Sequence, residues 1–163
     1  MTKVGIMSDS HGIVPPKVYS FFENVDLILH AGDIGSADVL WELRNFKNTI
    51  AVRGNTDSIY DFGGVKEVEI FSIEQIKVVL THIGGYPKHY QGNIKRLLTA
   101  EKPNLFICGH SHICKVMYDD DLSLLHINPG ACGKSGIHKK CTLIRLDIDQ
   151  RMMKNLELLE YDK

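Results

Sequence analysis

The stretch KVGIMSDSHG, residues 3–12, joins a short apolar run to a polar cluster, and this junction decides the fold class. Residues 3–7 have the length and the aliphatic content of a buried strand. Asp9 and His11 follow the run at once, and both are residue types that bind metals. Gly12 then permits a sharp turn of the backbone. A strand that ends in such a loop is typical of α/β proteins, whose ligand sites form at the carboxyl ends of the strands.

The same junction recurs along the chain, because four further apolar runs are each followed within about four residues by metal-ligating side chains. They are residues 26–29 with Asp33, residues 49–52 with Asn55, residues 77–80 with His82, and residues 105–108 with His110 and His112. The carboxyl ends of parallel strands meet at one edge of a sheet. We therefore expect two aspartates, one asparagine and four histidines to share one crevice.

Amphipathic stretches separate the apolar runs and predict three helices, at residues 17–23, 37–44 and 94–101, the last ended by Pro103. Residues 3–52 thus alternate strand and helix, and residues 68–71 and 77–80 are expected to form neighbouring strands. Beyond residue 115 the pattern changes to strands and turns, which predicts antiparallel hairpins. Their strands are expected at residues 116–119, 122–127, 141–147 and 154–161, with a turn at residues 128–130.

The composition is that of a globular protein and excludes several other classes. Hydrophobic residues make up 44% and charged residues 24% of the 163 residues, and the formal net charge is -1. No basic block is present, so a dedicated nucleic-acid binder is not expected. No apolar run approaches the length of a membrane span, and the N-terminus lacks the pattern of a signal peptide, so we expect a cytoplasmic location and no membrane partner.

We expect residues 1–163 to form one domain, in which two sheets pack together with helices outside, because no linker, low-complexity tract or repeat divides the chain. The 4 cysteines contain no C-x-x-C motif and are too sparse for a disulfide framework, so we expect reduced thiols.

The mixture of imidazole, carboxylate and amide donors suits Mn, Fe, Co, Ni or Zn better than Ca or Mg, and the absence of thiolates argues against a closed structural zinc site. Taken singly, each residue has an ordinary explanation: Asp9 or Asp33 could cap a helix, Asn55 could form a turn, and His82 could be packed. All of them at the same kind of strand end would require several independent coincidences. Seven ligands are too many for one ion and suit a pair.

Five short motifs carry a resemblance to a known family. They are Asp9-Ser10-His11, Gly32-Asp33, Gly54-Asn55, Thr81-His82 and Gly109-His110-Ser111-His112. In this order they resemble the D-x-H, G-D, G-N, H and G-H-x-H signature of the calcineurin-like metallophosphoesterase superfamily. The similarity covers nearly the whole chain. The short length, the stretch RGNTD at residues 53–57 and the NPG at residues 128–130 look most like the small single-domain phosphodiesterase branch of bacteria and archaea.

The resemblance implies a four-layer αββα sandwich of two mixed β-sheets flanked by helices, and a two-metal hydrolase that is often a homo-oligomer. It implies manganese, or else nickel, zinc, iron or cobalt, and a metal-activated bridging hydroxide that attacks phosphorus in line in a small phosphoester substrate. Asp33 would bridge the two ions. The remaining ligands would be Asp9, His11 and His112 for one metal, and Asn55, His82 and His110 for the other.

The sequence departs from the larger relatives at Thr56, where those proteins carry a histidine thought to help the leaving group depart. This removes the obvious general acid. Substrate contacts are expected from Asn55 and Thr56 and from the loop at residues 84–90, which follows His82 directly. The candidate side chains of that loop are Tyr86, Lys88 and His89.

Four polar residues have open interpretations. Asp57 either orients its neighbours or is a solvated turn carboxylate, and His30 is expected to be a packed strand histidine, with a supporting role as the alternative. His126 and His138 fit no constellation.

Two other functions compete with the hydrolase. The same fold includes a retromer subunit that is a non-catalytic protein-binding scaffold with a decayed metal site, whereas all seven ligand positions are filled here. A nuclease would need a basic groove with stacking aromatics, and the sequence contains neither.

Overall fold

The first of two sheets contains the amino-terminal and the carboxyl-terminal strands. In the computed structural model, which describes all residues 1–163, its strand order is β10-β9-β1-β2-β3. Strands β1, β2 and β3 are parallel, while β9 runs antiparallel to β1 and β10 antiparallel to β9. The bounds are β1 Thr2–Met7, β2 Leu27–His30, β3 Asn48–Ala51, β9 Lys140–Asp149 and β10 Met152–Asp162.

The second sheet has the order β4-β5-β6-β8-β7. Its three inner strands, β5, β6 and β8, are parallel, and its edge strands β4 and β7 are antiparallel to their neighbours. Both sheets are therefore mixed. The bounds are β4 Val68–Ile73, β5 Ile76–Thr81, β6 Leu105–Ile107, β7 Cys114–Asp119 and β8 Leu124–Pro129.

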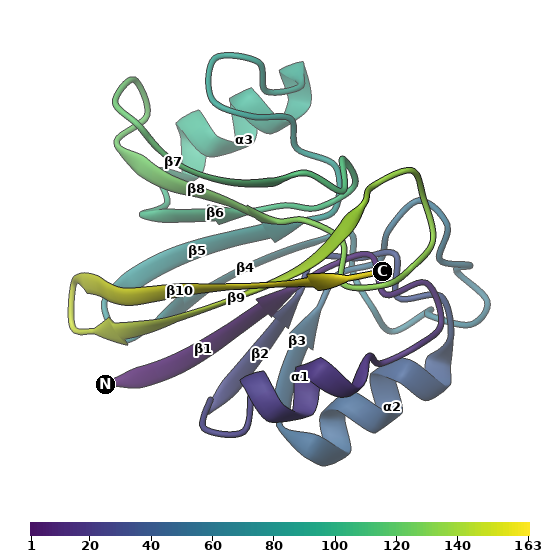
Figure 1. Cartoon of the computed structure of the whole chain (residues 1–163). Helices are drawn as coiled ribbons and strands as arrows, with labels where there is room; N and C mark the ends of the chain where they lie inside the picture. Colours follow the sequence, from purple (N-terminus) through teal and green to yellow (C-terminus); the bar gives the residue numbers. More distant parts are fainter.

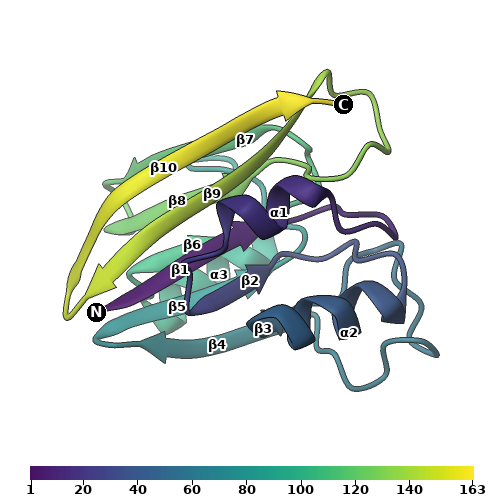
Figure 2. The ribbon, with the colours of Figure 1, turned by 60° about the horizontal axis from the view of Figure 1, so that its bottom comes forward.

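Three helices cover the outer faces of the sheets. Helices α1 (Pro16–Phe21) and α2 (Ala37–Phe46) lie on the first sheet, and α3 (Gly92–Glu101) lies on the second, as Figures 1 and 2 show. The start of α2 is capped by the Ser36 side chain, which accepts a hydrogen bond from the Val39 amide. The layers run helix, sheet, sheet, helix, which confirms the predicted αββα sandwich.

Three groups of buried apolar residues hold these layers together. The largest lies between the two sheets and includes Ile6 and Leu29 of the first sheet and Leu80 of the second, all fully buried. A second group joins the first sheet to α1 and α2 through residues such as Leu43, and a third joins α3 to the second sheet. Because both faces of β2 and β5 are covered, apolar residues stand at consecutive positions, as in residues 27–29 and 78–80, rather than alternating with polar ones.

All thirteen elements lie where the sequence predicts them, with shifts of a few residues at their ends. The expected turn at residues 128–130 is misplaced, because β8 continues to Pro129, which pairs with Cys114 of β7. Gly130 makes the turn instead, with a φ of 75° and its amide bonded to Asn128 Oδ1 at 2.9 Å.

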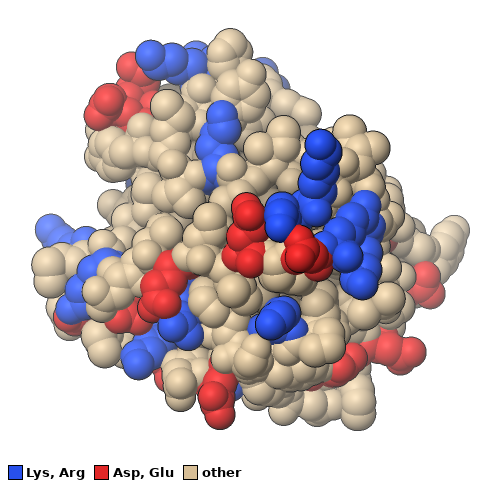
Figure 3. Space-filling model, in the orientation of Figure 1, with Lys and Arg blue, Asp and Glu red and all other residues tan.

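The distribution of surface charge and the state of the cysteines agree with what the sequence predicts. Acidic and basic side chains alternate on the face drawn in Figure 3, without a broad patch of either sign. All four cysteines are free thiols. No helix has both the length and the apolar character that crossing a membrane requires.

Candidate metal centre

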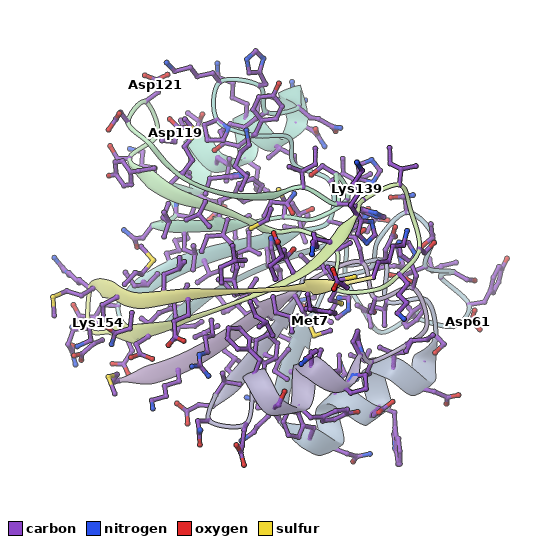
Figure 4. All side chains as sticks on the ribbon, in the orientation of Figure 1. Met7, Asp61, Asp119, Asp121, Lys139 and Lys154 are labelled. Atoms are coloured by element: carbon purple, nitrogen blue, oxygen red, sulfur yellow. The ribbon has the colours of Figure 1, made fainter.

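The polar loops converge at the carboxyl ends of the parallel strands of both sheets. Figure 4 places Met7, the last residue of β1, near the centre of the molecule, so the loop that carries Asp9 starts from the interior. The Asp9 amide donates to Gly32 O at 2.9 Å, and in the second sheet the Gly109 amide donates to His82 O, also at 2.9 Å. The loops of the two sheets meet where the His110 amide, after β6, donates to Asp9 Oδ2, after β1, at 3.1 Å.

Asp9, His11 and His112 form one cluster of possible metal ligands. His112 Nε2 lies 3.1 Å and His11 Nε2 3.9 Å from Asp9 Oδ1, and the two imidazole nitrogens are 3.5 Å apart. Three donor atoms thus face one small space. The Asp9 side chain is fully buried and the two rings are partly exposed, which leaves the space open to solvent on one side.

Asp9, Asp33 and His82 form a second cluster, which shares Asp9 with the first. His82 Nε2 lies 3.3 Å from Asp33 Oδ2 and 4.0 Å from Asp9 Oδ1. Asp33 Oδ2 is also 3.9 Å from His11 Nε2, so it approaches a histidine of each cluster. The two clusters form one continuous site around two carboxylates.

Two buried polar atoms in this site have no hydrogen-bond partner. They are Asp9 Oδ1 and His82 Nε2. The other atoms of these groups are engaged: Asp9 Oδ2 accepts from Ser8 Oγ at 2.6 Å and from the His110 amide at 3.1 Å, and His82 Nδ1 donates to Ala31 O at 2.7 Å. A buried carboxylate oxygen and a buried imidazole lone pair left without partners are costly. A bound cation would satisfy both, so these residues fit a metal ion.

His110 and Asn55, the two remaining predicted ligands, lie beside the clusters and are exposed. The ring centroid of His110 is 5.2 Å from that of His82. Asn55 lines a cavity of about 290 Å³ together with His82. All seven predicted positions are therefore at the same edge of the molecule.

Five of the seven predicted ligands have left-handed backbone conformations. Their φ angles lie between 48° and 69°, and the residues are Asp9, His11, Asp33, His110 and His112. A non-glycine residue in this region costs about 1 kcal/mol, and such strain concentrates at functional sites. Close backbone approach is also required, because a Cβ on Gly54 would collide with Asp33 Oδ1.

The local fields hold the two carboxylates charged. Burial raises the pKa of Asp33, but the adjacent His82 imidazole and the hydrogen bond from the Thr56 amide outweigh it and leave that pKa well below its usual range. Burial also raises the pKa of Asp9, but the neighbouring His112 imidazole and the hydrogen bond from Ser8 outweigh it, so this pKa is lowered too. Burial lowers the pKa of His82, but Asp33, Asp9 and the Ala31 carbonyl together outweigh it and leave that pKa above the usual value. The site without a metal is thus an anionic pocket that attracts cations.

Asp57 orients two of the ligand loops. It is buried, and its carboxylate accepts three backbone hydrogen bonds, from Ile34 at 3.0 Å, Gly35 at 2.9 Å and Gly54 at 2.8 Å. The first two amides follow Asp33 and the third precedes Asn55. Of the two sequence interpretations, the orienting carboxylate is the correct one.

His30, the last residue of β2, contacts two of the ligand loops. Its ring is fully buried, its Nδ1 accepts from the Gly32 amide at 3.2 Å, and its Nε2 lies 2.9 Å from Ser10 Oγ. Ser10 Oγ donates to Ile34 O, so it accepts the proton of His30 Nε2. Burial lowers the pKa of His30 to about 4, which keeps the ring neutral at pH 7. His30 is therefore a packed histidine that also fixes two loops.

His138 contacts the predicted ligand His112, and the sequence gives no sign of this contact. Its Nε2 lies 2.9 Å from Gly133 O, and its Nδ1 lies 3.1 Å from His112 Nδ1. Because a carbonyl only accepts, the proton of the neutral ring is on Nε2, and His138 Nδ1 accepts from His112. Burial lowers the pKa of His138 and favours this neutral form. The bond directs the lone pair of His112 Nε2 towards Asp9.

Asn128 positions the histidine pair from the second sheet. Its Nδ2 donates to Gly109 O at 2.8 Å and to Ser111 Oγ at 3.1 Å, on either side of His110. The N-P-G stretch is therefore part of the support of the site.

The expected substrate residues occupy different positions around the centre. The Thr56 amide donates to Asp33 Oδ1 at 3.0 Å. Tyr86 lines a cavity with His110. Lys88 and His89 are exposed and line neither neighbouring cavity, although the His89 ring contacts Tyr86 with centroids 4.8 Å apart.

Proteins similar to this chain were found by sequence and by structure. The family model of the calcineurin-like phosphoesterase superfamily domain matches residues 2–151. A probable metallophosphoesterase of Methanothermobacter thermautotrophicus is 33% identical over 133 residues, which cover 78% of this chain and 76% of the relative. A phosphodiesterase of Methanocaldococcus jannaschii is 30% identical over 146 residues, covering 80% of this chain and 84% of the relative.

A crystal structure of a Vps29 variant from Entamoeba histolytica superposes with a TM-score of 0.77 over 99% of both chains, at 16% identity. This likeness concerns the fold alone. The match of the family model over nearly the whole chain, together with the ligand-bearing loops described above, shows that the chain belongs to the calcineurin-like phosphoesterase superfamily.

Proposed function

We propose that this protein is a metal-dependent phosphodiesterase or phosphatase that hydrolyses a small phosphoester at a centre of two divalent metal ions. The observation that carries the proposal is the pair of buried, unpartnered ligand atoms, Asp9 Oδ1 and His82 Nε2, at the junction of two donor clusters. The activity named for the similar M. jannaschii protein supports it.

The proposed ligand sets share Asp33. Asp9, His11 and His112 complete one set, and Asn55, His82 and His110 complete the other. The distances of Asp33 Oδ2, 3.9 Å from His11 Nε2 and 3.3 Å from His82 Nε2, support a bridging role. We expect manganese to serve, with nickel, zinc, iron or cobalt as alternatives, since the donors are nitrogen and oxygen atoms.

A bound pair of divalent ions supplies a nucleophilic water at neutral pH and an electrostatic clamp for the phosphoryl oxygens. The chain's own residues create the conditions for in-line attack on phosphorus. Asp9 and Asp33 stay ionised, and the neutral histidines donate lone pairs without cancelling the charge of the ions. Because no histidine occupies position 56, the leaving group receives no proton from Thr56, and esters with acidic leaving groups are expected to react fastest.

The protein-binding scaffold remains the second candidate because the likeness to Vps29 spans the whole fold. Complete ligand positions and the orphaned Asp9 Oδ1 and His82 Nε2 support the hydrolase instead. We further propose a cytoplasmic protein whose substrate is a small molecule.

Two substitutions test the ligand assignment. Asp33→Asn should weaken both metal sites and lower the kcat for bis(p-nitrophenyl) phosphate more than His112→Ala, which touches one site only. Activity and metal content are measured for both variants after reloading with Mn²⁺, and circular dichroism checks that they fold. If Asp33→Asn keeps nearly native turnover and metal content, the bridging assignment is wrong.

A further inference from the structure

A second feature of the site is a cavity of about 360 Å³ lined by His110, by residues of β7 and β8, and by the loop after β5. This volume is at the small end of the range of ligand pockets. Because His110 is also a proposed metal ligand, a group attached to a bound phosphoryl centre would lie next to this cavity.

The walls of this cavity are largely apolar. Ile83, Tyr86 and Ile113 line it together with the backbone of Gly84 and Gly85. A Cβ on Gly84 would point into the core, 2.6 Å from the Phe106 ring, and one on Gly85 would collide with the backbone of His89, so the loop packs this closely only with glycine at both positions. The exposed ring of Tyr86 offers an aromatic face on which a planar ring can stack.

The floor carries a polar group without partners. His126 of β8 is fully buried, lines the cavity, and has no hydrogen-bond partner on either ring nitrogen. Its ring packs against Phe106 and Tyr90, with centroid distances of 5.6 Å and 5.8 Å. Burial, and to a smaller extent Lys115, lowers the pKa of His126 to about 4, so the neutral ring offers one donor and one acceptor.

Lys115 of β7 supplies a second donor beside the floor. Its Nζ lies 4.5 Å from the centroid of Tyr86, and no carboxylate pairs with it. Asn128, in contrast, is already engaged with Gly109, Ser111 and Gly130 and is not free to recognise a ligand. The groups that remain available are thus His126, Lys115 and the exposed Gln91.

We propose that this cavity binds the organic substituent of the phosphoester, and that this substituent is a flat heteroaromatic ring with a hydrogen-bonding edge, the chemistry of a nucleobase. The inference rests on the proposed phosphoesterase function and names the class of its substrate. The faces of the ring contact Ile83, Tyr86 and Ile113. A carbonyl on its edge accepts from Lys115, and a neighbouring donor or acceptor pairs with His126.

Three substrates with the same leaving group test the selection. They are the p-nitrophenyl esters of thymidine 5′-monophosphate, phenyl phosphate and methyl phosphate. We expect kcat/KM for the thymidine ester to exceed that for the methyl ester about tenfold, as one or two net hydrogen bonds provide, and to exceed that for the phenyl ester as well. Equal values for the thymidine and phenyl esters would overturn the proposal, because the cavity would then select apolar groups only.

Substitutions of residues that line the cavity test whether the preference for the thymidine ester arises there. Lys115→Met and His126→Phe should each reduce the ratio of thymidine to methyl ester at least about threefold, which is the loss of a single hydrogen bond. Lys115 is half-buried on an edge strand, so its variant answers the question even if His126→Phe does not fold. Lys95→Met, on α3 outside the cavity, is the matched control. An unchanged ratio in Lys115→Met contradicts the assignment.

Binding without turnover separates this inference from the function on which it rests. Thymidine, which has no phosphate, is added to metal-free protein while the imidazole signals are followed by NMR. We expect the His126 signals to shift and those of the other fully buried histidine, His30, to stay. Shifts at His126 support the cavity even if no ester is hydrolysed, whereas hydrolysis of all three esters with no shift at His126 refutes the cavity alone.

Discussion

At the scale of single residues, the centre depends on which nitrogen of each histidine carries the proton. His82 donates from Nδ1 to Ala31 O, and His112 donates from Nδ1 to His138, so both present Nε2 lone pairs to the carboxylates. The acceptor of His82 is a backbone carbonyl, whereas the acceptor of His112 is a side chain. A backbone carbonyl cannot be removed by substitution, whereas His138 can.

His138→Ala should therefore lower the affinity of the metal site that includes His112 by about 10- to 100-fold, the usual cost of losing such a supporting contact. His138→Asn, which retains an acceptor, should recover part of it. Competition with a metal chelator measures the affinity independently of activity. Ile137→Ala, on the fully exposed neighbouring residue, is the control. Native affinity in His138→Ala would show that His112 needs no partner.

The ligands could be predicted from sequence because each follows its own strand at once, as Asp9 follows β1. His138 could not be predicted in this way. It lies on the loop between β8 and β9, and only the pairing of β9 with β1 brings that loop to the ligand loops. Its role depends on tertiary contacts that no local spacing records.

At the scale of elements, the site is a set of loops held at fixed distances by backbone hydrogen bonds. Asp57 joins the loop after β2 to the loop after β3 by accepting from Ile34, Gly35 and Gly54. Three amides lose their acceptor in Asp57→Ala. Because each buried unpaired group costs roughly 1 kcal/mol or more, we expect the free energy of unfolding to fall by about 3 kcal/mol.

Urea unfolding of the metal-free protein measures this loss. Asp61→Ala, at an exposed position of the same segment that Figure 4 shows at the edge of the molecule, is the matched control and should be close to wild type. Equal stability of the two variants would contradict the role given to Asp57.

The order and type of the elements were predictable because β strands buried on both faces and amphipathic helices have distinct periodicities. The position at which β8 ends could not be predicted from the sequence. Asn128 and Pro129 have the composition of a turn, yet pairing with Lys115 and Cys114 of β7 keeps them extended. Here cross-strand contacts outweigh local preference.

At the scale of the whole molecule, two fully buried neutral histidines make the fold sensitive to acid. Burial lowers the pKa of both His30 and His126 to about 4, below the ordinary value of about 6.5 in the unfolded chain. The unfolded state therefore binds more protons as the pH falls from 6.5 to 4. Each histidine should cost about 2 kcal/mol of stability at pH 5 relative to pH 7.

His82 acts in the opposite direction, because its pKa is raised and its contribution to stability grows at low pH. The contribution of one buried histidine is isolated with His126→Phe. The difference in unfolding free energy between pH 7 and pH 5, measured with urea in the presence of a chelator, should be smaller in this variant than in wild type. The same difference in both proteins would show that His126 is not neutral in the folded state.

The central claim is a catalytic centre of two metal ions, and the most direct test is the metal content of the active protein. Protein stripped with a chelator, reloaded with Mn²⁺ and freed of excess metal is analysed by elemental mass spectrometry, while hydrolysis of bis(p-nitrophenyl) phosphate is followed in the same samples. The account predicts that activity rises with metal content and reaches its maximum near two ions per chain. Full activity in the stripped protein, or maximal activity at one ion per chain, would contradict it.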